Sequence, residues 1–392
     1  MTHKQTQLFI LLSVLLLIGG CSTAPFRHVV PKQHQDNVKV EGINNHIRFW
    51  GDTVPEHIDE LMRKSNEQIL KSQPGKDALN ILALSGGAED GAFGAGLLAG
   101  WSVEGTRPNF DVVTGVSIGA LIAPFAFLGP DYDHQLEMFF TTLATDDLLV
   151  TDIWRQILAV SGASAFADST PLANLIKRFV TAELMAKINA EHQKGRRLFI
   201  GTTNLDSQRP VIWNMGEIAT SKHPKALDIF RDVLLASASI PGVMPPVYFN
   251  VQIGNDTYQE LHVDGGVTSQ VFVYPIDIRL GDYEGEIPAK RTIYVIRNSK
   301  VKPEYIATAP QALSVSKRSI STLIKNQGLG DLYKMKLIAD RDRFQYRLAF
   351  IEDDFEHEAL EPFDTKYMKA LFKYAFSLGQ VGYQWRKSPS LD

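Results

Sequence analysis

Residues 115–119, which read G-V-S-I-G, constrain this 392-residue chain more than any other stretch. A β-type run at 110–114 precedes them, and an apolar helical run at 118–128 follows. Between a strand and a helix, G-x-S-x-G holds its serine on a tight, strained turn with the hydroxyl exposed above a sheet. A side chain at Gly115 or Gly119 would collide with the strand or helix packed on the turn. The pattern therefore favours a nucleophilic Ser117 over a chance pentapeptide.

The composition is that of an ordinary folded protein, with 44% hydrophobic and 21% charged residues. The length permits one large domain or two smaller ones. A net charge of −4 argues against general nucleic-acid binding. The single cysteine excludes an internal disulfide and a metal site built from several thiolates.

The first 20 residues are typical of a secretory signal, with Lys4, an apolar run at 8–18 and small residues after it. Residues 17–21, L-I-G-G-C, resemble a bacterial lipobox. The resemblance implies that Cys21 is lipidated and anchors the mature chain in the cell envelope. Ser22 follows, where lipoproteins of the inner membrane often have Asp, and this favours the outer membrane. A plain signal peptide with a chance cysteine is the alternative.

We expect four segments: a lipoprotein signal peptide over 1–20, a polar tether over 21–51, a catalytic domain over 52–300, and a helical or mixed extension over 301–392 packed on the same domain. Periodicity predicts helices at 58–69, 136–143, 151–160, 171–179, 229–238, 311–338 with a break near 328–330, and 365–378. It predicts strands at 78–84, 197–203, 210–214, 291–297 and 347–351, with another ending at 264. Strands that alternate with helices predict an α/β sandwich.

A glycine-rich loop, S-G-G-A-E-D-G at 85–91, follows the strand predicted at 78–84. Such a loop is an anion cradle, because glycine lets the backbone approach closely and unpaired N–H groups point inward. The anion could be a nucleotide phosphate or a reaction oxyanion. The spacing G-x-G-x-x-G is absent between Gly86 and Gly91, and no P-loop G-K-[ST] occurs. The nearby serine turn favours the oxyanion, and a tight turn with close helix packing is the structural alternative.

A serine hydroxyl needs a base to take its proton. Asp264 ends an apolar strand and is followed by two glycines, which leave it accessible; a turn aspartate with no catalytic role is the alternative. His262 would share the face of Asp264 in a strand, where a packed or hydrogen-bonding role is the simpler interpretation. His357, which alone among the histidines follows Asp264, lies in an acidic run typical of a solvated loop. The chain is thus consistent with a Ser–Asp dyad that lacks histidine.

Four segments in this order resemble the patatin-like phospholipase family: the loop at 86–91, the serine turn at 115–119, A-S-A-S-I-P-G-V-M-P-P at 236–246, and D-G-G at 264–266. The resemblance covers about residues 82–275. Each motif is weak alone, and the four together are specific. The resemblance implies a three-layer α/β/α sandwich with a mostly parallel central sheet.

The family also implies lipid acyl-ester hydrolysis, with Ser117 as nucleophile and Asp264 as proton acceptor. It implies an oxyanion hole formed by the backbone of Gly86, Gly87 and Ala88. It needs no metal or organic cofactor, and its substrate is a membrane lipid. The sequence indicates no particular protein partner.

Two residues depart from the family loop, which usually reads G-G-G-x-[RK]-G: Ala88 replaces its third glycine and Asp90 its basic residue. A carboxylate near the hole would oppose the oxyanion and repel a lipid phosphate. We therefore expect Asp90 to point away from the site and to cap the helix that begins near Gly91.

The sequence thus predicts a serine acyl hydrolase that releases fatty acids from phospholipids or other lipid esters. A lysophospholipase, thioesterase or acyltransferase would use the same dyad. A lipid-binding envelope protein with a degraded site is a further alternative, favoured by Asp90, and a histidine-dependent esterase is another. Apolar loops at 160–166 and 243–249 could admit an acyl chain, although core packing explains them equally well.

Overall fold

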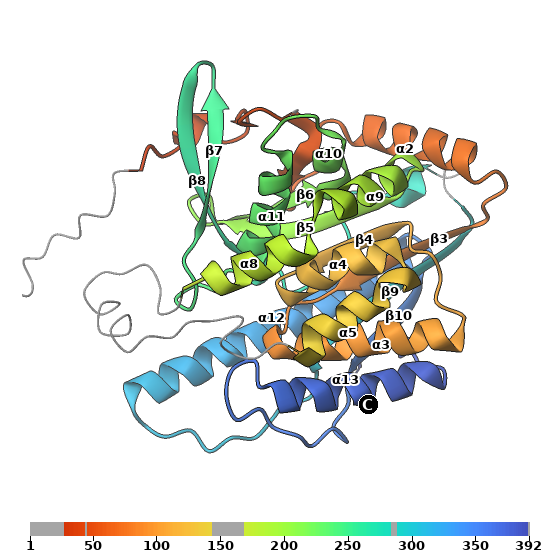
Figure 1. The fold of residues 1–392 in the computed structure, drawn as a ribbon, viewed down its shortest axis with the longest axis vertical. Coiled ribbons are helices and arrows are strands. Elements are labelled where there is room, and N and C mark those ends of the chain that lie inside the picture. The colour runs from red at the N-terminus through yellow and green to blue at the C-terminus, as the bar shows by residue number, and fades with distance from the viewer. Residues whose placement is uncertain (1–26, 44, 143–167, 284–287, 391–392) are drawn as a thin grey trace, which may run out of the picture.

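The computed structural model describes residues 27–43, 45–142, 168–283 and 288–390 (Figure 1). Ten strands form one sheet in the order β1-β7-β8-β5-β4-β3-β9-β10, with β6 paired to β5 and β2 paired to β6. The strands are β1 Lys39–Val40, β2 Arg48–Trp50, β3 Ala78–Leu84, β4 Val112–Val116, β5 Arg197–Asn204, β6 Arg209–Asn214, β7 Val247–Ile253, β8 Asp256–Asp264, β9 Lys290–Lys300 and β10 Gln345–Ile351.

Five neighbouring strands, β5, β4, β3, β9 and β10, are parallel. The other pairings, β5 with β6 and β8, β8 with β7, β7 with β1, and β6 with β2, are antiparallel. The expected parallel sheet is present in these five strands, and the sheet as a whole is mixed. The carboxyl ends of the parallel strands lie along one edge, which is where α/β proteins place their ligand sites.

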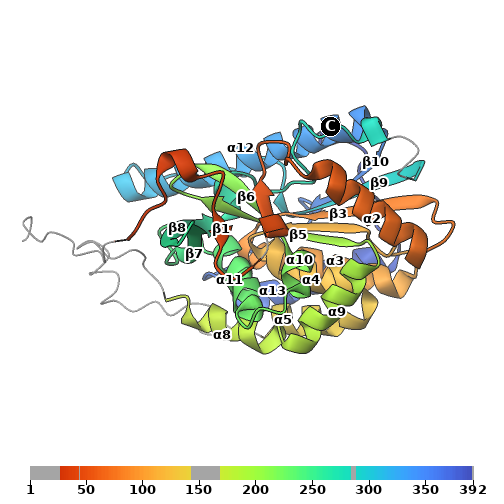
Figure 2. The same ribbon diagram turned by 90° about the horizontal axis from the view of Figure 1, so that it is seen from above.

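Helices cover both faces of the sheet, so the fold is the predicted three-layer α/β/α sandwich. They are α2 Ile58–Ser72, α3 Gly91–Glu104, α4 Ile118–Leu128, α5 Asp133–Thr142, α8 Thr170–Phe179, α9 Ala182–Gln193, α10 Met215–Thr220, α11 Ala226–Ser237, α12 Ala312–Arg341 and α13 Thr365–Gln380. Figure 2 shows α2 and α12 over one face, with α3, α4, α5, α9 and α13 on the other. Side chains that alternate along β3 divide between these layers: Leu82 and Leu84 join one apolar core, and Ile81 and Ala83 join the other.

The extension at 301–392 completes the sandwich. β10 adds a parallel strand beside β9, and α13 packs closely along α3. A Cβ on Gly96 of α3 would lie only 2.2 Å from the carbonyl oxygen of Phe372 in α13. Glycine at this position therefore permits the close contact between the two helices.

Two sequence expectations about the chain's organisation are wrong. The expected tether is folded from Arg27 onward among the described residues: β1 pairs with β7, β2 pairs with β6, and Ile47 is buried. These strands are too short to leave a periodic signal. The break expected near residues 328–330 is also absent, because α12 runs through it without interruption. A Cβ on Gly328 would lie 2.6 Å from Nη2 of the buried Arg297, so this glycine makes room for a side chain.

Three sequence predictions lie outside the described residues: the leader with Cys21, the helix at 151–160 and the loop at 160–166. Among the helices that the structure describes, none combines the length and the apolar character needed to cross a bilayer.

Candidate active site

Ser117 occupies a strained turn between β4 and α4. Its backbone has φ 54° and ψ −127°, a conformation that non-glycine residues rarely adopt. A Cβ on Gly115 would lie 2.5 Å from the carbonyl oxygen of Gly119, and one on Gly119 would lie 2.5 Å from that of Leu84. The two glycines therefore let the turn sit directly against β3 and α4, which is the steric role predicted for them.

Ser237, at the end of α11, holds this turn in place. The backbone N–H of Ser117 donates to its Oγ (3.0 Å), and that hydroxyl donates to the carbonyl oxygen of Gly201 in β5 (2.7 Å). Ser237 is fully buried. Ser237 lies in the family-like stretch at 236–246, but nothing in the sequence indicates which backbone group it contacts.

Asp264 lies beside Ser117, at the end of β8. The two side chains are within hydrogen-bonding reach of each other, and both are buried, with 7% of Ser117 and 5% of Asp264 exposed. The carboxylate also accepts a hydrogen bond from the N–H of Gly266 (2.7 Å), and the backbone N–H of Asp264 donates to the carbonyl of Ser239 (2.9 Å). The structure thus brings the two predicted dyad residues together.

Burial is the main influence on the Asp264 carboxyl. It raises the pKa of Asp264 to about 6, against the lowering effects of the hydrogen bonds from Ser117 and from Gly266. A carboxylate with a pKa near 6 is a stronger base than an exposed aspartate and is still ionised at neutral pH.

The glycine-rich loop approaches Ser117 from the end of β3. A Cβ on Gly86 would lie 3.1 Å from the Cβ of Ser117. However, the N–H of Gly86 donates to the carbonyl of Gln270 (3.0 Å), which removes it from the set of free donors. Within the described part of the chain, the N–H groups of Gly87 and Ala88 donate no hydrogen bond.

Gly87 and Ala88 have unusual backbone conformations. A Cβ on Gly87 would lie 1.9 Å from the carbonyl oxygen of Asn298, so only glycine fits. Ala88 has φ 49°, in the left-handed region that favours glycine. The loop therefore keeps a glycine-like shape although alanine replaces the family's third glycine.

Asn298, in β9, fixes this loop. Its backbone N–H donates to Ser85 Oγ (2.8 Å), and its Nδ2 donates to the Ser85 carbonyl (2.8 Å). Its Oδ1 accepts from the N–H of Gly94 (3.0 Å), and its side chain is fully buried. Asn298 belongs to a strand without a motif, so no signal in the sequence marks it as a residue of the site.

Among the described residues, neither candidate histidine is hydrogen-bonded to the dyad. His262 is buried, with Nδ1 2.9 Å from Thr202 Oγ1 and Nε2 3.2 Å from Glu260 Oε2, and burial lowers its pKa. Both ring nitrogens are therefore occupied by groups other than Ser117. His357 is exposed and stacks on Phe355. These contacts indicate a structural role for both histidines. Asp264 is therefore the candidate base beside Ser117.

Asp90 adopts an arrangement that the sequence did not predict. It stands at the N-cap position of α3, but its side chain makes no capping hydrogen bond, so the capping hypothesis is wrong. Its carboxylate instead accepts a hydrogen bond from the hydroxyl of Tyr367 in α13 (2.5 Å). Burial raises the pKa of Asp90 to about 7, while Tyr367 and Arg297 act in the opposite direction.

Arg297, in β9, supplies a buried positive charge close to Asp90. Only 4% of it is exposed, and burial lowers its pKa to about 10 against the opposing effects of Asp331 and Asp90. Its Nη1 lies 3.4 Å from Gln270 Oε1, and Gln270 is the residue that binds Gly86. This cation and the partly protonated Asp90 reduce the negative potential expected from an acidic residue in the loop.

The cavity at Ser117 is small. It measures about 20 Å³ and is lined by Ala88, Ser117, Ile118, Leu121, Leu172, Ala238, Ile240, Met244 and Phe363. Met244 belongs to the apolar loop predicted at 243–249, whereas Phe363 comes from the extension. The lining is chiefly apolar, as an acyl chain requires.

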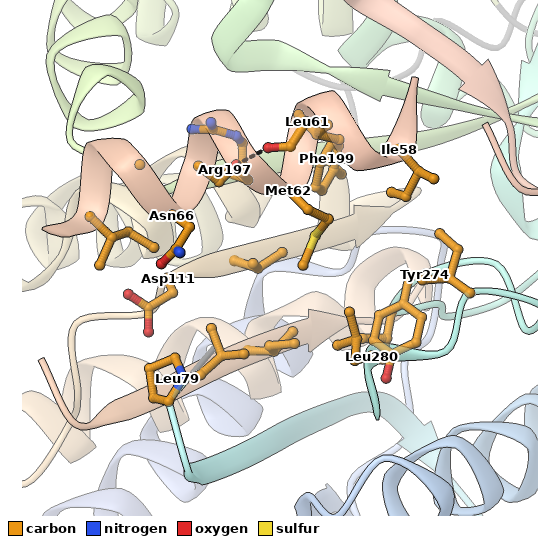
Figure 3. A pocket seen from close by; sticks show the side chains of 18 of the residues that line it. Ile58, Leu61, Met62, Asn66, Leu79, Asp111, Arg197, Phe199, Tyr274 and Leu280 are labelled. Carbon is orange, nitrogen blue, oxygen red and sulfur yellow. Dashed lines mark hydrogen bonds between the residues drawn. The ribbon is translucent and has the colours of Figure 1, made fainter. Parts of the chain in front are cut away.

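A larger cavity of about 310 Å³ lies under α2 (Figure 3). Its lining includes Leu79, Asp111 and Arg197, at the amino ends of the parallel strands, together with Met62 of α2. It is therefore at the opposite edge of the sheet from Ser117. Chemistry rather than cavity size identifies the candidate site, because the strained serine, the buried carboxylate and the free N–H groups meet only at the carboxyl edge within the described residues.

Three features meet at one edge of this α/β sheet: a serine on a strand–turn–helix, a buried carboxylate partner and a glycine-rich loop. Together they define a class of proteins with a nucleophile turn. The sequence model of patatin-like phospholipases matches residues 82–277, which is half of the chain. The chain therefore belongs to the patatin-like phospholipase family.

Individual relatives are more distant. Over 198 residues the chain is 28% identical to an uncharacterized protein of Acanthamoeba polyphaga mimivirus, and the match covers 50% of this chain and 60% of the viral protein. Among solved structures, VipD from Legionella pneumophila superposes with a TM-score of 0.34 at 11% identity, over 80% of this chain and 68% of VipD. The type III effector protein ExoU superposes with a TM-score of 0.32 at 12% identity, over 80% of this chain and 56% of ExoU. The family assignment rests on the family model alone.

Proposed function

We propose that this protein is a lipid acyl hydrolase that cleaves fatty-acyl esters through a Ser117–Asp264 dyad. The observation that carries the proposal is the placement of the strained Ser117 beside a buried carboxyl whose pKa is raised to about 6. Membership of the patatin-like phospholipase family supports a lipid ester as the substrate.

In this mechanism Ser117 Oγ attacks the ester carbonyl carbon while Asp264 accepts the hydroxyl proton. Collapse of the tetrahedral intermediate breaks the bond to the alcohol, which takes the proton from Asp264. Water then attacks the acyl-enzyme and gives up a proton to Asp264. The fatty acid departs, and the proton returns to Ser117.

The oxyanion would be held by the N–H groups of Gly87 and Ala88, both unused within the described part of the chain. The bond from Gly86 to Gln270 supports this geometry by fixing the start of the loop beside Ser117. Preorganised donors of this kind stabilise the transition state without reorganisation cost at the moment of reaction.

The test is fatty-acid release from a diacyl phospholipid in mixed micelles, using the full chain with Cys21→Ser. We expect Ser117→Ala and Asp264→Asn each to lower kcat by roughly 10³-fold or more. Ser102→Ala in α3 and Asp256→Asn at the tip of the β7–β8 hairpin are matched controls and should retain activity. Full activity in either dyad variant would refute the mechanism.

The alternative substrates are separated by the same proteins. If the protein cleaves a lysophospholipid or a thioester in a Ser117-dependent way but releases no fatty acid from the diacyl lipid, the substrate assignment changes and the Ser117–Asp264 mechanism is retained. Transfer of the acyl group to an added alcohol would identify an acyltransferase. The absence of both hydrolysis and fluorophosphonate labelling of Ser117 would favour a lipid-binding protein with a degraded site.

We also propose that Cys21 is lipidated and anchors the protein in the bacterial outer membrane. The L-I-G-G-C sequence and the following Ser22 support this. Metabolic labelling with a radioactive fatty acid in a bacterial host should label the parent chain and not Cys21→Ser, and fractionation should locate the labelled chain in the outer membrane. Equal labelling of both chains would contradict the anchor.

A further inference from the structure

The first half of α12 extends beyond the body of the molecule. Asp331, about two-thirds of the way along this helix, accepts from the backbone N–H of Gln270 (2.7 Å), just after the β8 carboxyl end. At the far end of α12, the Asp342 carbonyl accepts from Arg291 at the start of β9. The helix thus runs antiparallel to the parallel strands, and its first turns project past their carboxyl edge, as Figures 1 and 2 both show.

This projecting half carries exposed apolar side chains. Leu323, Ile320 and Ile324 are 70%, 58% and 41% exposed. Spacings of three and four residues place them on one side of the helix. Ile320 and Ile324 precede the buried Gly328 by two turns and one turn, so they continue the stripe that faces the core further along. We call these three side chains the α12 stripe.

Two basic side chains lie beside the α12 stripe. Residues 302–325 contain four Lys or Arg residues and one Glu. Lys302 pairs with Asp353 (2.9 Å) and Lys325 pairs with Glu304, so among the described residues of this stretch Lys317 and Arg318 are the cations that no carboxylate neutralises. Glu304 binds Lys325 (2.9 Å), and its carbonyl accepts from Arg318, so the preceding loop is held against the helix. Tyr305 and Ile306, in that loop, are 95% and 61% exposed. Apolar and basic side chains therefore occur together on the projecting tip.

Such a combination matches the interface of an anionic bilayer, where apolar side chains enter the acyl boundary and basic ones meet the head groups. We propose that the projecting half of α12 is a membrane-binding element that lies in the interface of an anionic lipid bilayer and brings the Ser117 edge of the sheet to its lipid. The choice of a lipid surface as the partner rests on the proposed function, and the exposed stripe and basic charge are independent of it.

The test is binding of the full chain with Cys21→Ser to vesicles of phosphatidylglycerol and phosphatidylethanolamine, measured by co-sedimentation. The leader is common to all variants. Ile320→Ser, Leu323→Ser and Ile324→Ser combined should weaken binding at least tenfold. Lys317→Gln with Arg318→Gln should weaken it about fivefold and reduce its sensitivity to salt. Vesicles of phosphatidylcholine alone should bind the parent chain more weakly.

Matched controls are Leu70→Ser in α2 and Val103→Ser in α3, each 60% exposed and near the amino edge of the sheet. They should bind vesicles as the parent does. Hydrolysis of a soluble short-chain ester should be unchanged in the stripe variant, which shows that it is folded.

Equal vesicle binding by the parent and the stripe variant would overturn the proposal. So would a parent that binds no vesicles, or a stripe variant that only converts a dimer into a monomer. If the α12 stripe is needed for vesicle binding but the protein has no esterase activity, the membrane-binding proposal stands and the proposed function is refuted. If hydrolysis depends on Ser117 but vesicle binding does not depend on the stripe, the proposed function stands and the membrane-binding proposal is refuted.

Discussion

The hydroxyl of Tyr367 donates a 2.5 Å hydrogen bond to the carboxylate of Asp90, joining the C-terminal helix α13 to the loop beside Ser117. Asp90 stands where the family loop usually has a basic residue. Burial raises the pKa of Asp90 to about 7, and Arg297 lies close enough to favour its ionised form. The acidic substitution is thus accommodated by a partner from the extension and by a nearby buried cation.

The raised pKa of Asp90 predicts a pH-dependent cost in stability. The folded state keeps this proton up to about pH 7, whereas an unfolded aspartate loses it near pH 4. Stability therefore falls as pH rises between these values. Asp90→Asn should raise the free energy of unfolding by roughly 4 kcal/mol at pH 8 and leave it nearly unchanged at pH 4.

Urea unfolding at both pH values measures this effect. Asp256→Asn, an exposed position in the same protein, is the control and should change little. A gain of the same size at pH 4 and pH 8 would contradict a titrating Asp90.

The pKa of Asp264 predicts the acid limb of the activity profile. As the base, Asp264 must be ionised, so kcat/KM should rise with pH and reach half its maximum near pH 6. The profile is measured with a soluble short-chain ester. In Asp90→Asn, the pH at which kcat/KM reaches half its maximum should stay near 6. If that pH shifts in Asp90→Asn, the titration belongs to Asp90 instead.

Ala88 should carry a conformational cost that glycine removes. Its φ of 49° lies in the left-handed region, which costs a non-glycine residue roughly 1 kcal/mol. Ala88→Gly should raise the free energy of unfolding by about 0.5–1 kcal/mol, since the greater freedom of glycine in the unfolded chain offsets part of the gain. Activity should be retained because the N–H remains. A loss of stability on urea unfolding would show that the methyl group packs favourably.

Ser237 should support both stability and turnover. Ser237→Ala leaves the N–H of Ser117 and the carbonyl of Gly201 without their buried partner. We expect a loss of about 1–3 kcal/mol in unfolding free energy, together with a lower kcat because the serine turn loses its support. Ser239→Ala removes a buried hydroxyl whose single hydrogen bond within the described residues goes to the carbonyl of Leu235, so it should cost less and leave kcat unchanged. Equal kcat values in the two variants would argue against a positioning role for Ser237.

The sequence by itself determined the local elements that carry the candidate site. The spacing of apolar residues and the local composition located β3, β4, β5 and most helices, because the apolar patterns of these elements are long enough to be periodic. Glycines around Ser117 and after Asp264 marked the two turns, since few other residues fit such turns. The order of these motifs was enough to indicate the family and the α/β/α sandwich.

Only the tertiary structure decided how those elements support one another. Gly86 donates its N–H to Gln270, which leaves the N–H groups of Gly87 and Ala88 as the free donors of the loop within the described residues. The position of the serine turn depends on its hydrogen bond to Ser237. β1 and β2 are too short to show a period, and their pairing depends on distant strands. Asp90 meets Tyr367 instead of capping its own helix because α13 packs beside α3. Each of these contacts joins residues far apart in the chain, so no local pattern encodes it, and burial sets the pKa values only after the fold has formed.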